Sequence, residues 1–425
     1  MTLALVWVLT ITVTYFIINN TNPLPGIVEA FSKFSELSRP SARWTEQLGD
    51  PPSAAVVAGD AVVVVSREAV EARSLATGVV LWDRTTAWSA VAGDEAAAVV
   101  VVGARGGGIE VLDPRAGTVR WRDPEGVAAW TFRTAVLTLT CPATGGCAVV
   151  ARAPADGAQR WRTQVPGLGR GDRGVNRQLV LPRDVTARYP AAVGAQPRVL
   201  PAVLGLAVGR KVEMIDTASG RRASALTPSG SVSVTLVGGR AVSTTTTPQG
   251  RSCGYGIDAT VPATGAVAWH RDGYDPHTVT GAGCEEHRAP TGAAGALVVT
   301  RTDRREALLA GADGREVRVA APGESVRSIG ERTARVRSAD AATIRAVDTA
   351  SGKQRWSQPL PERAAVTVLR HAVLVLDEDT ARLFAYDQDT GRRLLDARIL
   401  GEVIGSGPTG LILARGRTIG FVAWS

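Results

Sequence analysis

The sequence predicts an all-β fold, a β-propeller of about eight four-stranded blades, and three observations support this prediction. Short valine-rich runs such as AVVVVS at 61–66 and AVLVLD at 372–377 follow one another from Arg43 onward, separated by Gly, Pro, Asp and Thr, as strands joined by turns are. The phrase IRAVDTASGKQRW at 344–356 has a close variant, IEVLDPRAGTVRW, at 109–121. Most copies of the phrase are spaced by about forty residues, which is the length of one propeller blade.

An anchor in the membrane is expected before the propeller. Residues 3–18 form an uncharged apolar run, and together with its neighbours the segment 1–22 approaches the roughly 20 residues that span a bilayer. No basic start and no small-residue cleavage site marks it as a removable signal peptide, so we predict a retained transmembrane signal anchor. Lys33 and Arg39 follow the run and no basic residue precedes it, which leaves open whether Met1 is the true start.

Residues 23–42 are expected to form a stalk or linker with an amphipathic helix. Ile27, Phe31, Phe34 and Leu37 repeat at helical spacing between two prolines, which places them on one face. We expect this face to cover an end of the following domain; the alternative is that it lies on the membrane surface. The propeller itself is predicted over residues 43–425.

Glycine and aspartate have turn-forming roles in the phrase. The glycine supplies the positive φ angle of a tight hairpin turn. Where an aspartate stands four residues earlier, its carboxylate accepts hydrogen bonds from amides of the same turn. The eight glycines are Gly78, Gly117, Gly157, Gly220, Gly265, Gly314, Gly352 and Gly391, and the aspartates are Asp113, Asp216, Asp348 and Asp387.

A tryptophan stands four residues after the glycine in five copies. A large ring at one fixed point of each outer strand is suited to pack against the neighbouring blade, and its indole N–H needs an acceptor there. We therefore interpret these residues as blade-docking residues of structural importance. They are Trp82, Trp121, Trp161, Trp269 and Trp356, while the degenerate copies have Ser224, Arg318 and Leu395.

The two ends of the propeller sequence are predicted to share one blade. Three strand-like pieces, EVIGSG, GLILARG and RTIGFVAWS, follow the last phrase, and RWTEQL at 43–48 resembles an outer strand without a blade. Their pairing would close the ring and remove an open sheet edge. Eight phrases and this composite blade make nine, but propellers usually have four to about eight blades. We expect eight, with the copy around Gly314 irregular.

The phrases VDTASGKQRW, LDPRAGTVRW, SLATGVVLW and YDQDTGRRLL resemble the repeat of pyrroloquinoline-quinone-type propellers. This family includes quinoprotein alcohol dehydrogenases and a non-catalytic lipoprotein propeller that helps to assemble outer-membrane barrels. The resemblance covers roughly residues 43–425 and implies the fold and the tryptophan docking. It also implies, for the enzymes, two adjacent bonded cysteines, a calcium site and an aspartate base. Cys141 and Cys147 are not adjacent, so no catalytic, cofactor-binding or metal-binding residue is assigned.

The cysteines favour an oxidising, extracytoplasmic compartment. An even number of cysteines without C-x-x-C spacing is compatible with two disulfides. Cys141 and Cys147 bracket a Pro/Gly turn that can bring them together, which leaves Cys253 and Cys284 for the second pair. The alternative is four buried thiols.

Two other segments are candidates for binding. His277, Cys284 and His287, with Glu285 and Glu286, form a mixture of metal-ligand types in a Gly-rich loop, but their spacing matches no recognised site. Residues 165–200 lie in the longest interval between phrases, and such insertions sit on one face of a propeller, often the binding face. We interpret 165–200 either as an irregular loop or as a loop that contacts a protein partner.

The charge of the chain does not indicate nucleic-acid binding. The net charge is +8, but only three of the 48 cations are lysines and the arginines are scattered among 40 acidic residues, without the basic stripe that phosphate contacts need. We therefore expect a membrane-anchored, extracytoplasmic propeller that acts as a non-catalytic binding or scaffold protein for protein or envelope partners. The alternative is a quinoprotein-like oxidoreductase that uses pyrroloquinoline quinone at the ring centre, and a third hypothesis is a sensor domain.

Overall fold

The computed structural model describes residues 42–104, 107–182, 188–223, 226, 232–250, 252–276, 284 and 289–425. The anchor expected over 1–22 and the stalk expected over 23–42 lie outside these residues, except that Ala42 begins the first strand. Within the described ranges, no helix combines the length and the apolar character that crossing a membrane requires.

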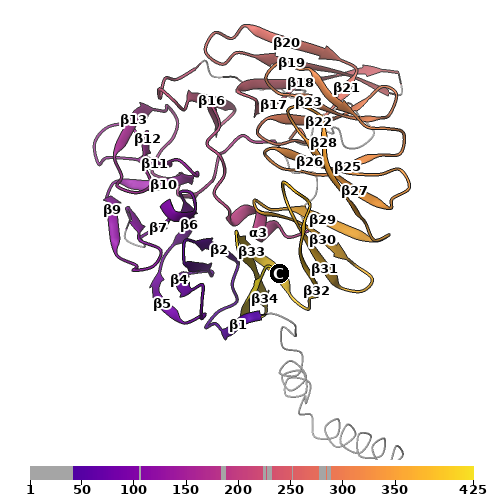
Figure 1. Cartoon of the computed structure of the whole chain (residues 1–425). Helices are drawn as coiled ribbons and strands as arrows, with labels where there is room; N and C mark the ends of the chain where they lie inside the picture. The colour runs from indigo at the N-terminus through magenta and orange to yellow at the C-terminus, as the bar shows by residue number, and fades with distance from the viewer. Residues whose placement is uncertain are drawn as a thin grey trace, which may run out of the picture.

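The described chain forms nine β-sheets arranged around a ring (Figure 1). We number them as blades I to IX in the order of their first strands at the ring centre. Blade I contains β2 (Ala54–Ala58), β3 (Ala61–Val65), β4 (Ala69–Ser74) and β5 (Val80–Thr85). Blade II contains β6 (Trp88–Ala92), β7 (Val99–Gly103), β8 (Ile109–Leu112) and β9 (Val119–Asp123), with a 3-10 turn η1 (Glu95–Ala97). Blade III contains β10 (Gly126–Thr131), β11 (Val136–Thr140), β12 (Ala148–Arg152) and β13 (Gln159–Gln164).

The other half of the ring begins with a short blade. Blade IV contains β15 (Val203–Val208) and β16 (Lys211–Asp216), and blade V contains β17 (Val232–Val237), β18 (Arg240–Gln249), β19 (Ser252–Thr260) and β20 (Val267–Asp272). Blade VI contains β21 (Tyr274–Asp275), β22 (Ala296–Arg301), β23 (Glu306–Ala310) and β24 (Glu316–Val319). Blade VII contains β25 (Ser325–Ile329), β26 (Thr333–Arg337), β27 (Thr343–Asp348) and β28 (Gln354–Pro359). Blade VIII contains β29 (Ala364–Val368), β30 (Ala372–Asp377), β31 (Arg382–Asp387) and β32 (Arg393–Arg398).

Blade IX joins the two ends of the described chain. It contains β33 (Glu402–Gly407), β34 (Gly410–Arg415), β35 (Thr418–Ala423) and, as its outermost strand, β1 (Ala42–Gln47). Strand β1 is antiparallel to β35, with Trp44 opposite Phe421 and Glu46 opposite Ile419. The predicted closure by the N-terminal and C-terminal strands is therefore confirmed.

The hydrophobic core is divided among the interfaces between blades. Each of the nine interfaces between consecutive blades has a buried cluster of its own. The valine-rich second strands supply much of it, since Val62, Val63 and Val64 of β3 are fully buried and lie against blade IX or blade II according to their face. Successive side chains of a central strand point to opposite faces of the blade, and each face packs against a neighbouring blade. Both faces are therefore buried, which explains the continuous apolar runs.

The predicted blade count was wrong by one, and so was the choice of the irregular copy. The segment around Gly314 forms the four-stranded blade VI, because β22 and β23 bury Leu297, Val299 and Leu309 against blade V. The short blade is IV, where only two named strands pair and the next segment adds isolated bridges from Leu226 to Val212 and from Arg222 to Ile215.

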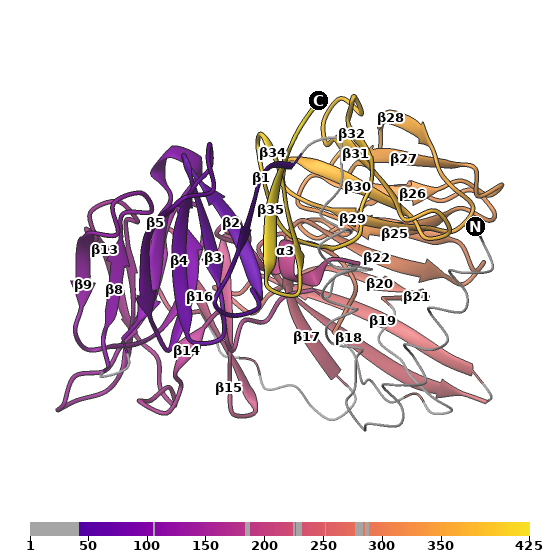
Figure 2. The same cartoon turned by 90° about the horizontal axis from the view of Figure 1, so that it is seen from below.

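The described parts of the insertion at residues 165–200 include elements that lie toward the centre of the ring. It contains β14 (Gly174–Val175), which is parallel to β10, and helix α3 (Pro190–Ala195), which packs on β33 and β2. Figures 1 and 2 show α3 between the two halves of the ring. Nine blades enclose a wide centre, and Tyr189 and Ala192 fill part of it, with 3% and 0% of their surfaces exposed.

Candidate functional site

The repeated phrase forms the turn between the third and fourth strands of a blade, and its glycine contacts the tryptophan of the preceding blade. Gly391 has a φ of +73°, and a Cβ atom placed there would lie 2.6 Å from Cγ of Trp356. The indole N–H of Trp356 donates to the carbonyl oxygen of Gln388 in the same turn, at 3.1 Å. Only glycine satisfies both the backbone angle and the approach of the ring.

Each of the five predicted tryptophans packs its ring on the phrase glycine of the next blade. Trp82 lies on Gly117, Trp121 on Gly157, Trp161 on Gly220, Trp269 on Gly314 and Trp356 on Gly391. Each indole N–H donates to a carbonyl oxygen at 2.8–3.1 Å, on Pro114, Pro154, Thr217, Gly311 and Gln388 respectively. The tryptophan ring and its hydrogen bond therefore tie each of these blades to the next one.

The two remaining interior glycines show what happens where the tryptophan is missing. A Cβ atom on Gly265 would meet nothing within 4 Å, whereas one on Gly352 would lie 2.1 Å from the carbonyl oxygen of Val317. The sequence analysis missed a sixth docking residue, Trp44, which lies on Gly78 and donates to the carbonyl oxygen of Leu75 at 2.9 Å. The Arg-Trp pair at 43–44 carried the signal, because the same pair ends three other phrases, at 120–121, 160–161 and 355–356.

The four predicted aspartates lie in turns, and their carboxylates accept hydrogen bonds from backbone amides. Oδ1 of Asp348 accepts from Ala350 N at 3.1 Å and Ser351 N at 2.8 Å. The equivalent bonds to Asp113, Asp216 and Asp387 come from Ala116 N, Ser219 N and Thr390 N, each at 2.8 Å. Hydrogen bonding from Arg355 and then from Ser351 N lowers the pKa of Asp348 well below its usual range.

We expect the Asp348→Asn substitution to cost about 1 kcal/mol near neutral pH, as loss of a capping side chain does. Because the pKa of Asp348 is lowered by folding, its carboxylate stabilises the fold fully above the unfolded pKa of about 3.9, and this stability is lost as the pH falls through the folded pKa. The difference between wild type and variant in urea unfolding should therefore shrink below about pH 4. Asp50→Asn, at an exposed position, serves as the control; a difference that grows in acid would contradict the assignment.

The four cysteines form two disulfides, as the interpretation of an oxidising compartment requires. Cys141 is bonded to Cys147 across the turn between β11 and β12, with the two Cα atoms 4.2 Å apart. Cys253, on β19, is bonded to Cys284, with a Cα distance of 5.5 Å. The alternative of four thiols is therefore wrong. His277, Glu285, Glu286 and His287 of the candidate metal loop lie outside the described residues.

The described residues do not fit the quinone and calcium site of the dehydrogenases that the sequence resembles. The bonded pair Cys141–Cys147 bridges a hairpin and is not made of adjacent residues. The recurring aspartates are engaged in turns, and in the part of the chain that the structure describes no three His, Cys, Asp or Glu side chains gather in a way that could hold a metal ion.

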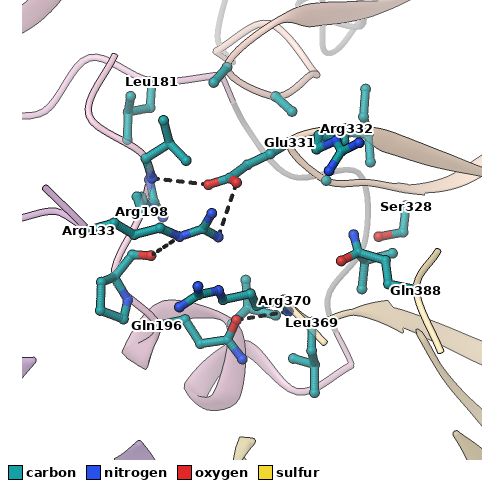
Figure 3. Close-up of a pocket in the computed structure, with 18 of the residues that line it drawn as sticks. Arg133, Leu181, Gln196, Arg198, Ser328, Glu331, Arg332, Leu369, Arg370 and Gln388 are labelled. Atoms are coloured by element: carbon teal, nitrogen blue, oxygen red, sulfur yellow. Dashed lines mark hydrogen bonds and ion pairs between the residues drawn. The ribbon is translucent and has the colours of Figure 1, made fainter. Parts of the chain in front are cut away.

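A cavity of about 300 Å³ lies between the insertion and the turns of several blades (Figure 3). The turns that follow β10, β25 and β29, and the phrase turn between β31 and β32, contribute residues to its wall, together with residues 292–294 before β22. In antiparallel blades these four turns lie at the same end of the ring. The insertion supplies the remaining wall with residues 181–182 and 193–201.

One side of the cavity is built around an internal carboxylate. Glu331 is paired with the Arg133 guanidinium at 3.1 Å and accepts a hydrogen bond from Val199 N at 3.1 Å. Nε of Arg133 also donates to the carbonyl oxygen of Pro197 at 3.3 Å. Figure 3 shows these bonds joining blades III and VII to the insertion.

A second group of polar contacts fixes the other end of the insertion. The Gln196 amide accepts from Arg370 N at 2.9 Å and donates to Oγ of Ser406 at 2.5 Å. The Arg370 guanidinium pairs with Asp94 and, at 3.6 Å, with Glu95. Burial and the neighbouring charge of Arg370 lower the pKa of His371 below its ordinary value, which keeps its imidazole neutral at pH 7.

The phrase turn of blade VIII connects the cavity to the blade-docking contact. The Gln388 carbonyl oxygen accepts from Trp356 at 3.1 Å and from Arg335 at 3.4 Å, while the Gln388 side chain lines the cavity. Burial lowers the pKa of Arg335 to about 9, and its guanidinium carbon lies 4.9 Å from the centre of the Trp356 ring.

Comparison with known proteins gives a family and a fold. A family model described as outer membrane protein assembly factor BamB matches residues 26–271, 254–402 and 340–420. Among solved structures, BamB from Moraxella catarrhalis is 15% identical, with 89% of this chain and 98% of that chain covered and a TM-score of 0.40. Quinohemoprotein alcohol dehydrogenase from Comamonas testosteroni is 13% identical, with 90% and 76% covered and a TM-score of 0.39. A search of curated protein sequences finds no match.

The matches of the family model together span residues 26–420, which include β1 and the first part of β35. The matched residues contain the phrase turns and the tryptophan contacts described above. The chain therefore belongs to the family of pyrroloquinoline-quinone-like repeat propellers whose model is described as outer membrane protein assembly factor BamB.

Proposed function

We propose that this protein is a non-catalytic propeller that binds a protein or envelope partner, that residues 1–22 anchor it in the cell membrane, and that the propeller lies on the extracytoplasmic side. Membership of a family whose model is described as an assembly factor supports the scaffold role. Two disulfides support the compartment, because such bonds persist where the surroundings are oxidising.

The observation that carries the binding role is the position of the insertion. Part of it occupies the ring centre and, with turns from blades III, VI, VII and VIII, lines one cavity at one end of the ring. Hydrogen bonds from Arg188 N to Thr367 and from Gln196 to Ser406 hold it against the inner strands of blades VIII and IX. A rigid site of this kind has little conformational entropy to lose when a partner binds.

The alternative is a quinoprotein-like oxidoreductase. Its cofactor would need the ring centre, but Tyr189 and Ala192 of the insertion are buried there. Stoichiometric quinone and calcium in the purified full-length protein, together with alcohol-dependent reduction of a dye, would favour this alternative over the scaffold role.

The binding role can be tested by crosslinking in cells with the full-length chain. A photo-reactive phenylalanine analogue replaces Val199, a cavity residue with 43% of its surface exposed, or Val267, which is 62% exposed on the outermost strand of blade V. We expect a discrete crosslinked product from position 199 and none from position 267. Equal products at both positions, or none at 199, would contradict a partner site at the cavity.

A further inference from the structure

We propose that the central cavity recognises carboxylate side chains in a short acidic segment of the protein partner. This inference rests on the proposed function and adds the chemistry of the segment that binds. It is drawn from the charges in the cavity wall, from the way in which the wall holds a carboxylate of its own, and from the size of the cavity.

The cavity wall has an excess of positive charge. It contains four arginines, Arg133, Arg198, Arg332 and Arg370, and two carboxylates, Glu331 and Asp389, so its net charge is 4 − 2 = +2. The seventh ionisable group, His371, has a pKa lowered by burial and adds no positive charge at pH 7.

The pairing of these groups leaves two arginines available. Arg133 is paired with Glu331, and Arg370 with Asp94 and Glu95. The carboxylate of Asp389 is paired with Arg355 at 2.9 Å. Arg198 and Arg332 are exposed and form no ion pair with any residue that the structure describes. An arginine in this position offers a planar set of donors that matches a carboxylate.

Glu331 shows how the cavity binds a carboxylate. Its two oxygens are held by one guanidinium, that of Arg133, and by one backbone amide, Val199 N. Arg198 precedes this amide directly and Arg332 follows Glu331 directly in sequence. Both arginines thus line the same cavity as this carboxylate site and are sequence neighbours of the residues that form it, and two further carboxylates would balance the remaining charge of the wall.

The apolar side chains of the cavity wall restrict which other groups of a ligand can enter the cavity. Ile329, Val368 and Leu369 line the cavity, and Leu369 and Ile329 are only 2% and 4% exposed. A volume of about 300 Å³ is at the lower end of small-molecule sites. This space suits two or three side chains of an extended segment, with an apolar side chain next to the acidic ones.

The test measures binding of a fluorescein-labelled hexapeptide with two glutamates among leucines to the detergent-solubilised full-length chain, by fluorescence anisotropy at low salt. The matched probe has glutamine in place of glutamate. We expect the glutamine probe to bind at least tenfold more weakly, since a hydrogen bond to a charged group is worth about one to two powers of ten in affinity. Added salt should weaken binding of the glutamate probe.

Three variants assign the effect to the cavity. Arg198→Gln and Arg332→Gln should each weaken binding of the glutamate probe about tenfold. Arg162→Gln removes the same charge from an exposed position on β13, away from the cavity wall, and should leave binding unchanged. Because Arg198 and Arg332 are exposed and form no ion pair with the residues that the structure describes, all three variants should keep the unfolding temperature of wild type.

The outcomes separate this inference from the proposed function. If the wild-type chain binds both probes equally or neither, or if Arg162→Gln weakens binding as much as Arg332→Gln, carboxylate recognition in the cavity is wrong. The crosslink from position 199 would then still support a partner of other chemistry. If the glutamate probe binds as expected and no crosslink forms at 199, the carboxylate site stands and the partner-binding role fails.

Discussion

Replacing Trp356 with alanine should destabilise the propeller by about 3 to 5 kcal/mol, the usual cost of removing a large buried aromatic side chain. Trp356 is 7% exposed, packs on Gly391 of the next blade and donates to Gln388. Its loss leaves a cavity between blades VII and VIII and removes the ring above which the buried Arg335 lies. Equilibrium unfolding in urea measures the change in the free energy of unfolding.

Trp356→Phe is the control that separates the ring from its N–H group. Phenylalanine keeps an aromatic ring near Gly391 but cannot donate to the Gln388 carbonyl oxygen, so we expect a smaller loss of about 1 to 2 kcal/mol. A loss below 1 kcal/mol for Trp356→Ala, or equal losses for both variants, would show that the ring does not hold the two blades together.

The second large effect is expected at the glycine that the ring contacts. Gly391 and Gly265 have nearly the same φ, +73° and +71°, but a Cβ atom at 391 meets Trp356 at 2.6 Å and one at 265 meets nothing within 4 Å. Gly265→Ala should therefore cost only the backbone penalty of about 1 to 2 kcal/mol. Gly391→Ala should cost about 1 to 3 kcal/mol more, because the added methyl group overpacks the interface. Thermal and urea unfolding of the two variants give the comparison.

A double variant checks the cause of this difference. In a Trp356→Ala background the clash is absent, so Gly391→Ala should cost no more than Gly265→Ala does in wild type. The corresponding coupling energy between positions 356 and 391 is expected to exceed 1 kcal/mol, as for other residues in direct contact. Additive effects of the two substitutions would argue that the steric contact is not the origin of the glycine requirement.

The fold could be predicted because each phrase contains its own turn and its own contact to the next blade. Asp348, Gly352 and Trp356 lie within nine residues of sequence, and each acts through local geometry. Counting blades was harder, because Leu297 and Leu309 stabilise blade VI without a tryptophan phrase. Packing between apolar strands thus stabilises a blade whose phrase has Arg318 in place of the tryptophan.

The cavity could not be predicted from the sequence because its wall has no motif. Arg133, Arg198, Glu331 and Arg370 are far apart along the chain and come together only when the insertion enters the ring. The length of the insertion singled it out and predicted a place on one face of the propeller, but not that helix α3 packs on the inner strands β2 and β33. Its buried Tyr189 was the available sign that part of it packs inside.

The pairing of β1 with β35 also has a consequence for biosynthesis. The chain is synthesised from its N-terminus, so the partner strand β35, Thr418–Ala423, becomes available only after strands β2 to β34 have been made. Until then the outermost strand of blade IX has no sheet to join, and the nascent ring stays open with exposed edges that invite aggregation. A chain that lacks Thr418–Ala423 should therefore be removed by quality-control proteases, although the strands of the other eight blades are all present.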